Sequence, residues 1–190
     1  MVQTTFDASK MTTLELHGGA KMPQVGLGLW KLPKEVTPSQ VYNAIKCGYR
    51  LLDGACDYGN EKEVGEGIKK AIDEGIVKRE DLFVVSKLWN TFHRPEHVEP
   101  ALKRTLADLG LEYLDLYIIH FPIHLKYVDP AVRSPPEWVH DPNGEAKCLE
   151  FDDNVTYQKT YGAMEACQEK GLTKNIGVSN IQFMMFREIF

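Results

Sequence analysis

Hydrophobic and polar residues follow a pattern along this chain that is typical of strands followed by helices. Leu14 and Leu16 alternate with polar residues around Gly18-Gly19, which predicts a hairpin over residues 13–24. Short apolar segments predict five further strands, over residues 25–30, 49–53, 82–88, 114–120 and 175–180. Apolar residues at helical spacing predict four helices between them, over residues 38–48, 60–75, 95–110 and 156–170.

The ends of these helices carry local signals. Pro38 and Pro95 lie in first turns, and glycines follow the helices at positions 48, 75, 110 and 171. Asn60 with Glu63 three residues later predicts a capping box at the start of the second helix. In the fourth helix, three residues are expected to face the core: Tyr157, Tyr161 and Met164.

Repeated strand–helix alternation indicates parallel βαβ units. A doubly wound sheet and a (β/α)8 barrel of the TIM type, seen in part, both fit. A dinucleotide-binding sheet would carry GxGxxG between its first strand and helix, whereas Gly26 and Gly28 lie inside the strand and the third glycine is absent. We therefore predict the α/β barrel, with the two glycines serving strand geometry and close backbone approach.

The length of the chain departs from a whole barrel, which typically has about 250 residues. Five strands are predicted here, so residues 1–190 are expected to form one partial barrel domain, truncated by an incomplete gene model or a retained intron. Residues 122–155 hold five of the ten prolines and predict a long functional or mobile loop. Residues 181–190 form an apolar tail without a capping signal, and residues 183–186 are expected to be apolar surface.

Composition excludes several classes of protein. The 22 Lys+Arg and 27 Asp+Glu residues give a net charge of −5 without a basic run, which argues against nucleic-acid binding. No apolar stretch is long enough to span a membrane, and the N-terminus does not resemble a signal peptide. The spacing of the four cysteines matches no zinc site or redox pair, so we expect unpaired thiols, most of them packing residues, in a cytoplasmic protein.

Four polar side chains stand at or after the ends of successive predicted strands: Asp53, Tyr58, Lys87 and His120. Taken singly, a strand-end lysine or histidine is as well explained by a solvated or structural role. All four at matching ends of a parallel sheet, where barrels carry their active sites, indicate a functional site.

These four groups suit the reduction of a carbonyl. A phenol has an ordinary pKa near ~10, and a neighbouring ammonium stabilises its ionised form, so the two together make a proton donor. A carboxylate balances the charge of the ammonium, and an imidazole can orient the carbonyl oxygen. Because no side chain donates hydride, this reaction requires a nicotinamide cofactor.

Other polar residues have simpler explanations. His93 and His97 are four residues apart, but Pro95 lies between them, so no metal site is expected. We expect His124 to be a loop residue and Asp115 to pair with a cation or cap its strand. Trp138 is interpreted either as part of a lid or as a packing residue.

Four sequence blocks resemble those of the aldo-keto reductases and follow the family's order. They are DGACDYGNE (53–61), VVSKLW (84–89), YLDLYIIHFP (113–122) and IGVSN (176–180). The pair Asp57-Tyr58 and the segments LWNTFHRPEHV (88–98) and HFPIHLKYV (120–128) resemble the xylose (aldose) reductase branch. The loop over residues 129–155 departs from the pattern of that branch.

The resemblance implies NADPH- or NADH-dependent reduction of an aldehyde or aldose, such as a pentose, to the alcohol. It implies that Tyr58 is the general acid, that Lys87 and Asp53 tune it, and that His120 orients the carbonyl. It also places the cofactor against Ser179, Asn180 and Asp53, and the sugar against Trp30, Asp57, Trp89 and His120. A catalytically dead truncated form, or a non-catalytic binding protein on the same fold, remains the alternative.

Overall fold

The computed structural model describes residues 11–144 and 147–189, so expectations for residues 1–10 lie outside the described part of the chain. The predicted hairpin is present as the antiparallel pair β1 (Thr13–Glu15) and β2 (Lys21–Pro23). The five predicted strands form one parallel sheet: β3 (Gly26–Gly28), β4 (Leu51–Asp53), β5 (Phe83–Leu88), β6 (Leu116–Ile119) and β7 (Ile176–Val178).

The order of the strands distinguishes the two architectures. Within the sheet the order is β3-β4-β5-β6-β7, so each strand lies beside its neighbour in sequence. A doubly wound sheet reverses this order at a switch point, which the described strands do not do. The consecutive order therefore favours the barrel.

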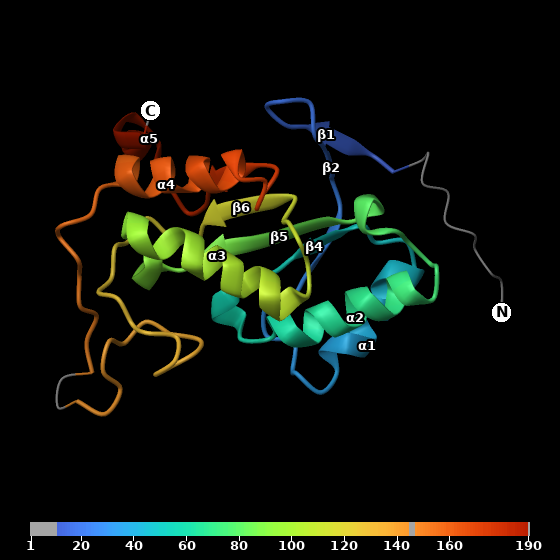
Figure 1. Cartoon of the computed structure of the whole chain (residues 1–190), viewed down its shortest axis with the longest axis horizontal. Coiled ribbons are helices and arrows are strands. Elements are labelled where there is room, and N and C mark those ends of the chain that lie inside the picture. Colours follow the sequence, from blue (N-terminus) through green and yellow to red (C-terminus); the bar gives the residue numbers. More distant parts are fainter. Residues whose placement is uncertain (1–10, 145–146, 190) are drawn as a thin grey trace.

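Five helices accompany the strands: α1 (Thr37–Lys46), α2 (Glu61–Asp73), α3 (Pro95–Leu109), α4 (Tyr157–Glu169) and α5 (Phe183–Ile189). In Figure 1, α3 lies across β5 and β6, with α1 and α2 on one side of it and α4 on the other. The first four helices are those predicted. The tail also contains a helix, α5, which we did not predict because the tail has no capping signal.

The core lies between the sheet and these helices. Leu52, Val84 and Tyr117 from three adjacent strands are buried in it, together with Met164 and Cys167 of α4. Met164 faces inward as predicted, Tyr161 is half-buried against this core, and Tyr157 is half-buried. The apolar stripes of the helices thus cover the sheet and leave its carboxyl edge to polar side chains.

The predicted capping box of α2 is wrong. The Asn60 side chain does not cap the helix, and its Nδ2 donates instead to the carbonyl oxygens of Leu29 and Leu32, at 3.0 and 3.3 Å. These carbonyls belong to a loop after β3 that is distant in the sequence. The Asn60 side chain therefore makes a tertiary contact, although the local sequence pattern predicted that it would cap the helix.

Close packing explains Gly26 but not Gly28. A Cβ atom at position 26 would lie 2.1 Å from Leu51 Cδ2, so the predicted close approach of two strands is present there. At position 28 a Cβ would meet nothing within 4 Å.

A glycine contact between α2 and α3 yields a stability prediction. A Cβ at Gly65 would lie 2.4 Å from the backbone oxygen of Leu109, so Gly65→Ala forces the two helices apart. We expect this substitution to lower the free energy of unfolding by about 1–3 kcal/mol. Urea denaturation measures the change.

Gly162→Ala in α4 is the matched control. A Cβ there meets only the Glu165 side chain, at 3.9 Å, so we expect a gain of roughly 1 kcal/mol from helix propensity. Equal stability of Gly65→Ala and the native chain would contradict the packing argument.

The long segment over residues 122–155 runs along one end of the molecule (Figure 1). It is joined to itself by a bridge between Leu125 and Phe151, and to α3 by an ion pair between Arg94 and Asp152 with an N–O distance of 2.5 Å. The Leu125 N–H also donates to the Asn90 carbonyl at 3.0 Å, so the described part of this segment is held to the body of the molecule near both of its ends.

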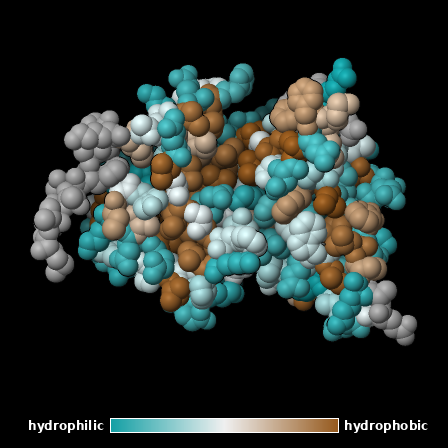
Figure 2. Space-filling model, turned by 180° about the vertical axis from the view of Figure 1, so that it is seen from behind, coloured by the Kyte–Doolittle hydropathy of each residue, from teal (hydrophilic) through white to brown (hydrophobic). Residues whose placement is uncertain are grey.

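Apolar side chains also reach the surface. Figure 2 shows the face opposite to that of Figure 1, where hydrophobic residues gather in a hollow between hydrophilic flanks. The predicted apolar surface of the tail is confirmed, because Phe183 and Met184 are 83% and 68% exposed. Across residues 11–144 and 147–189, no helix combines the length and apolar character that a membrane span requires.

The cysteines are free, as expected, but they do not all pack in the core. Cys167 is buried and Cys56 is half-buried, whereas Cys47 and Cys148 are exposed. The packing role predicted for most of the thiols fits Cys167 and Cys56 and does not fit Cys47 and Cys148.

Candidate active site

Three of the four predicted side chains meet at the ammonium of Lys87. Its Nζ lies 2.7 Å from Asp53 Oδ1 and 3.1 Å from the Tyr58 hydroxyl oxygen, and it also donates to the Gly54 carbonyl at 2.8 Å. The rings of Tyr58 and His120 lie edge to face, with centroids 5.7 Å apart. The four groups thus form one cluster, which we call the tetrad.

Strand register brings these residues together. Asp53 at the end of β4 pairs with Val85, and Lys87, two residues further along β5, pairs with Ile118 of β6. Tyr58 closes a short 3-10 turn, η2 (Cys56–Tyr58), which ends at Gly59 with a φ of 72°. Because that left-handed conformation suits glycine, the sequence can turn sharply after Tyr58 and begin α2 three residues later.

Lys87 is buried, so its charged ammonium depends on the contacts around it. The residue is only 6% exposed, and an ammonium in such surroundings requires a counter-charge and hydrogen-bond acceptors. Asp53 supplies the charge, and Gly54 and Tyr58 supply further oxygen atoms. The phenol of Tyr58 is therefore in direct contact with a buried cation.

His120 is held as a neutral imidazole. Burial, and then the charge of Lys87, lower its pKa from 6.5 to about 4. Its Nδ1 atom is buried and has no hydrogen-bond partner among the described residues. A neutral ring beside the phenol can donate a hydrogen bond to a substrate oxygen from one nitrogen.

Ser179 and Asn180 follow β7 and lie beside His120. The Asn180 side-chain nitrogen donates to the backbone oxygen of His120 at 2.8 Å and to Ser179 Oγ at 2.9 Å. Asn180 has a left-handed backbone, with a φ of 58°. The two predicted cofactor residues therefore stand next to the tetrad, at the same edge of the sheet.

Asp57 and Trp89 both contact Glu137, a residue of the long loop. Burial raises the pKa of Asp57 from 3.8 to about 6, and the negative charge of Glu137 adds to this rise. Trp89 is 1% exposed, packs against the His120 ring at 5.3 Å, and donates its indole N–H to the Glu137 carbonyl at 3.1 Å. Trp138 packs edge-on against Trp89 at 4.8 Å, so both interpretations of it stay open.

Trp30 differs from the other predicted substrate residues. It is 64% exposed, and the ammonium of Lys31 lies 4.4 Å from its ring. No described contact joins it to the tetrad.

Sequence reasoning missed Glu137, Gly54 and Phe121. Phe121 stacks on the His120 ring with centroids 4.7 Å apart, and it directly follows His120, so its position in the sequence was a usable signal. The contacts of Gly54 and Glu137 run through backbone atoms, which the sequence pattern does not reveal.

Three histidines outside the tetrad have separate partners. His93 Nδ1 lies 2.9 Å from His124 Nδ1, whereas His97 stacks on Tyr127 at 3.8 Å. No group of three possible metal ligands occurs among the residues that the structure describes. His93 and His124 form a partly buried contact between the turn that precedes α3 and the long loop, which sequence reasoning did not predict.

This contact predicts a pH dependence of stability. Burial, and then His124, lower the pKa of His93 from 6.5 to about 3, so the unfolded chain binds the extra proton as the pH falls below about 6.5. We expect His93 to account for a loss of about 1.5–2 kcal/mol between pH 6.5 and 5. Urea denaturation of the native chain and of His93→Gln at both pH values measures this difference.

His17→Gln is the control, because His17 is exposed and its substitution leaves the contact of His93 with His124 intact. A native chain that loses no more stability on acidification than His93→Gln would contradict the assignment.

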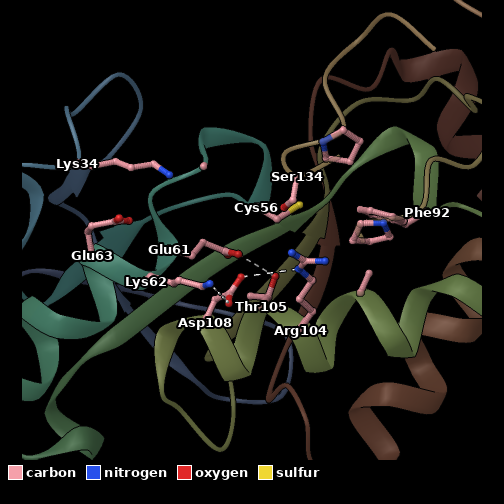
Figure 3. Close-up of a pocket in the computed structure, with 14 residues that line it drawn as sticks. Lys34, Cys56, Glu61, Lys62, Glu63, Phe92, Arg104, Thr105, Asp108 and Ser134 are labelled. Atoms are coloured by element: carbon pink, nitrogen blue, oxygen red, sulfur yellow. Dashed lines mark hydrogen bonds and ion pairs between the residues drawn. The ribbon is translucent and has the colours of Figure 1, made fainter. Parts of the chain in front are cut away.

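A separate pocket of about 150 Å³ lies beyond the η2 turn, between α2, α3 and residues 130–136. Figure 3 shows Lys62 and Arg104 reaching toward Asp108, and Glu61 toward Thr105. Glu61 is buried there, and burial raises its pKa to about 7. No residue of the tetrad lines this pocket, so it is distinct from the candidate active site.

The fold agrees with comparisons to known proteins. The chain belongs to the Aldo/keto reductase family, whose defining sequence pattern matches residues 24–189. It is 57% identical over 178 residues to an NAD(P)H-dependent D-xylose reductase of Pyricularia oryzae, covering 93% of this chain and 54% of that protein. It is 57% identical over 174 residues to an NADPH-dependent aldose reductase of Saccharomyces cerevisiae, covering 92% and 53%.

A solved structure supports the same assignment. The aldose reductase of Schistosoma japonicum superposes with a TM-score of 0.83 at 40% identity, over 94% of this chain and 56% of that one. This confirms the predicted barrel-type fold for the five strands present. The chain spans about half the length of the curated relatives that it matches.

Proposed function

We propose that this protein reduces the aldehyde group of an aldose, such as the pentose xylose, to the alcohol with NADPH or NADH. The observation that carries the proposal is the contact of the buried Lys87 ammonium with both the Asp53 carboxylate and the Tyr58 hydroxyl. The relatives named as D-xylose and aldose reductases support the class of substrate and of cofactor.

Tyr58 is the proton donor in this proposal. As the carbonyl oxygen gains negative charge, Tyr58 transfers its hydroxyl proton to that oxygen. The Lys87 ammonium stabilises the phenolate that remains, and Asp53 keeps the ammonium charged. The proton returns to Tyr58 from solvent after the alcohol leaves.

His120 positions the carbonyl. Its low pKa keeps the imidazole neutral at physiological pH, so it donates a hydrogen bond without competing with Tyr58 as the acid. Asn180 holds the His120 backbone from the neighbouring strand end and thereby fixes the direction of the ring.

Ser179 and Asn180 are the residues that we propose to hold the cofactor, with Asp53 next to them. The hydroxyl of Ser179 and the exposed amide of Asn180 offer both donors and acceptors, which fits the carboxamide of a nicotinamide. A reduced nicotinamide held by these residues would supply the hydride to the carbonyl carbon.

Asp57 and Trp89 are proposed to face the sugar. The buried Oδ1 of Asp57 has no described hydrogen-bond partner and can accept one from a sugar hydroxyl. Trp30 is proposed to close the outer side of the sugar site, for which its exposure leaves it available. We also propose a cytoplasmic location, which the four free cysteines support.

The test follows NADPH binding and xylose reduction by the purified chain. We expect NADPH to quench tryptophan fluorescence on titration, and xylose to be converted to xylitol with loss of NADPH absorbance. Binding without turnover would favour the non-catalytic alternative, and absence of both would contradict the proposal.

A further inference from the structure

The loop after β3 contains a tight turn with Trp30 at its second position. The Leu32 N–H donates to the Leu29 carbonyl at 3.4 Å and closes the turn over residues 29–32. Lys31, the third residue of the turn, has a φ of 61°, in the left-handed region where turns usually place glycine. Because a lysine is strained in that conformation, the turn requires contacts that hold it.

The side chain of Trp30 does not supply such contacts. It is 64% exposed, and the contact described for its ring is with the ammonium of Lys31, the next residue in the chain. The place of the indole ring therefore depends on the backbone of the turn.

Asn60 holds that backbone from a segment that is distant in the sequence. Its Nδ2 donates to the carbonyl oxygens of Leu29 and Leu32, at 3.0 and 3.3 Å, which belong to the first and the last residue of the turn. Asn60 is 2% exposed, so these hydrogen bonds are shielded from competing water. One buried amide thus binds both ends of the turn.

The turn is also joined to the tetrad. The Leu29 N–H donates to the backbone carbonyl of Asp53 at 3.0 Å. Asn60 follows Tyr58 in the chain, with Gly59 between them. The turn that carries Trp30 is therefore held by two segments, and each of them contains a residue of the tetrad.

We propose that Asn60 is a positioning residue of the substrate site: its amide holds the strained turn over residues 29–32 and thereby keeps Trp30 in place as the outer wall for the carbon chain of the sugar. The inference rests on the proposed reduction of an aldose. Asn60 acts through Trp30 and does not touch the reacting atoms, so its loss weakens the binding of long substrates and leaves the chemical step intact.

Asn60→Ser isolates this contact. Asn60 directly precedes α2, at a position that serine favours, so the helix keeps a suitable start. The serine side chain is too short to bind both carbonyl oxygens. Asn175→Ala is the matched control, because the Asn175 amide donates to the Asp115 carbonyl at 2.8 Å, at the end of the sheet opposite to the tetrad.

One arm of the test needs no turnover. NMR relaxation of the backbone nitrogens measures the order parameters of Trp30 and Lys31. We expect values of about 0.85 in the native chain and a fall to below about 0.6 in Asn60→Ser. In Asn175→Ala the two order parameters should stay at their native values.

The other arm compares D-xylose with propanal, an aldehyde with a shorter chain. In Asn60→Ser, KM for xylose is expected to rise about five- to ten-fold while kcat stays within about two-fold of native, because binding is lost equally from the substrate and the transition state. KM for propanal should stay native. The double variant with Trp30→Ala should have the same KM for xylose as Trp30→Ala alone, because Asn60 acts through Trp30.

The outcomes separate this inference from the proposed function. Unchanged order parameters in Asn60→Ser overturn the inference, and so does an unchanged KM for xylose or a further rise of KM in the double variant. An Asn60→Ser chain that does not fold also overturns it, since the amide would then hold the fold as a whole. If the native chain reduces neither aldehyde, the proposed function fails, and the NMR arm alone decides whether Asn60 holds the turn.

Discussion

Replacing Tyr58 with phenylalanine is expected to lower kcat for xylose reduction by about 10²–10⁴-fold. The substitution removes the hydroxyl that lies 3.1 Å from Lys87 Nζ and keeps the aromatic ring that packs against His120. The proton donor is therefore lost without a change of shape. NADPH oxidation with saturating xylose measures kcat, and a fluorescence titration measures cofactor binding, which we expect to stay close to native.

Tyr42→Phe is the matched control. The Tyr42 hydroxyl donates to Glu74 on the exposed surface between α1 and α2, far from the tetrad in the fold. Loss of that hydroxyl should leave kcat unchanged. Turnover of Tyr58→Phe at the native rate would remove Tyr58 from the acid role.

Lys87→Met is expected to lower kcat by about 10²–10³-fold. The ammonium stabilises the phenolate that forms as the proton leaves Tyr58, and methionine fills a similar volume without that charge. The substitution also leaves the Gly54 carbonyl and Asp53 without their donor. Because the charge and not the volume is lost, the pH dependence of kcat should change together with its magnitude.

Lys69→Met is the matched control, because it removes a lysine that forms an ion pair on the surface. Lys69 forms an exposed pair with Asp73 within α2, so its loss should leave kcat and its pH dependence as in the native chain. An unaltered pH–rate profile in Lys87→Met would argue against the coupling of Lys87 and Tyr58.

The strands and most helices follow from the sequence because their signals are local. Apolar runs bounded by glycine and proline indicated all five parallel strands, and the strand-end positions of Asp53, Lys87 and His120 anticipated their meeting. Asp115 also behaves as expected. It accepts from the Val84 backbone at 3.0 Å and pairs with Arg79 at 2.8 Å.

Other features depended on contacts between distant segments. Asn60 was assigned to a helix cap, but the carbonyls of Leu29 and Leu32, some thirty residues away, take its amide. The contact of His93 with His124 joins the turn that precedes α3 to a loop whose path no periodicity specifies. Glu137 acts through its backbone, and a residue's carbonyl carries no signature in the sequence.

The Lys87 ammonium donates three hydrogen bonds, to oxygen atoms of Asp53, Gly54 and Tyr58. A flexible four-carbon side chain has thus lost its rotational freedom during folding, before any sugar arrives. A mobile lysine would lose conformational entropy in each catalytic cycle, whereas Lys87 loses it once, when the chain folds. Reagents that acylate amines should accordingly label the surface lysines long before they reach this one.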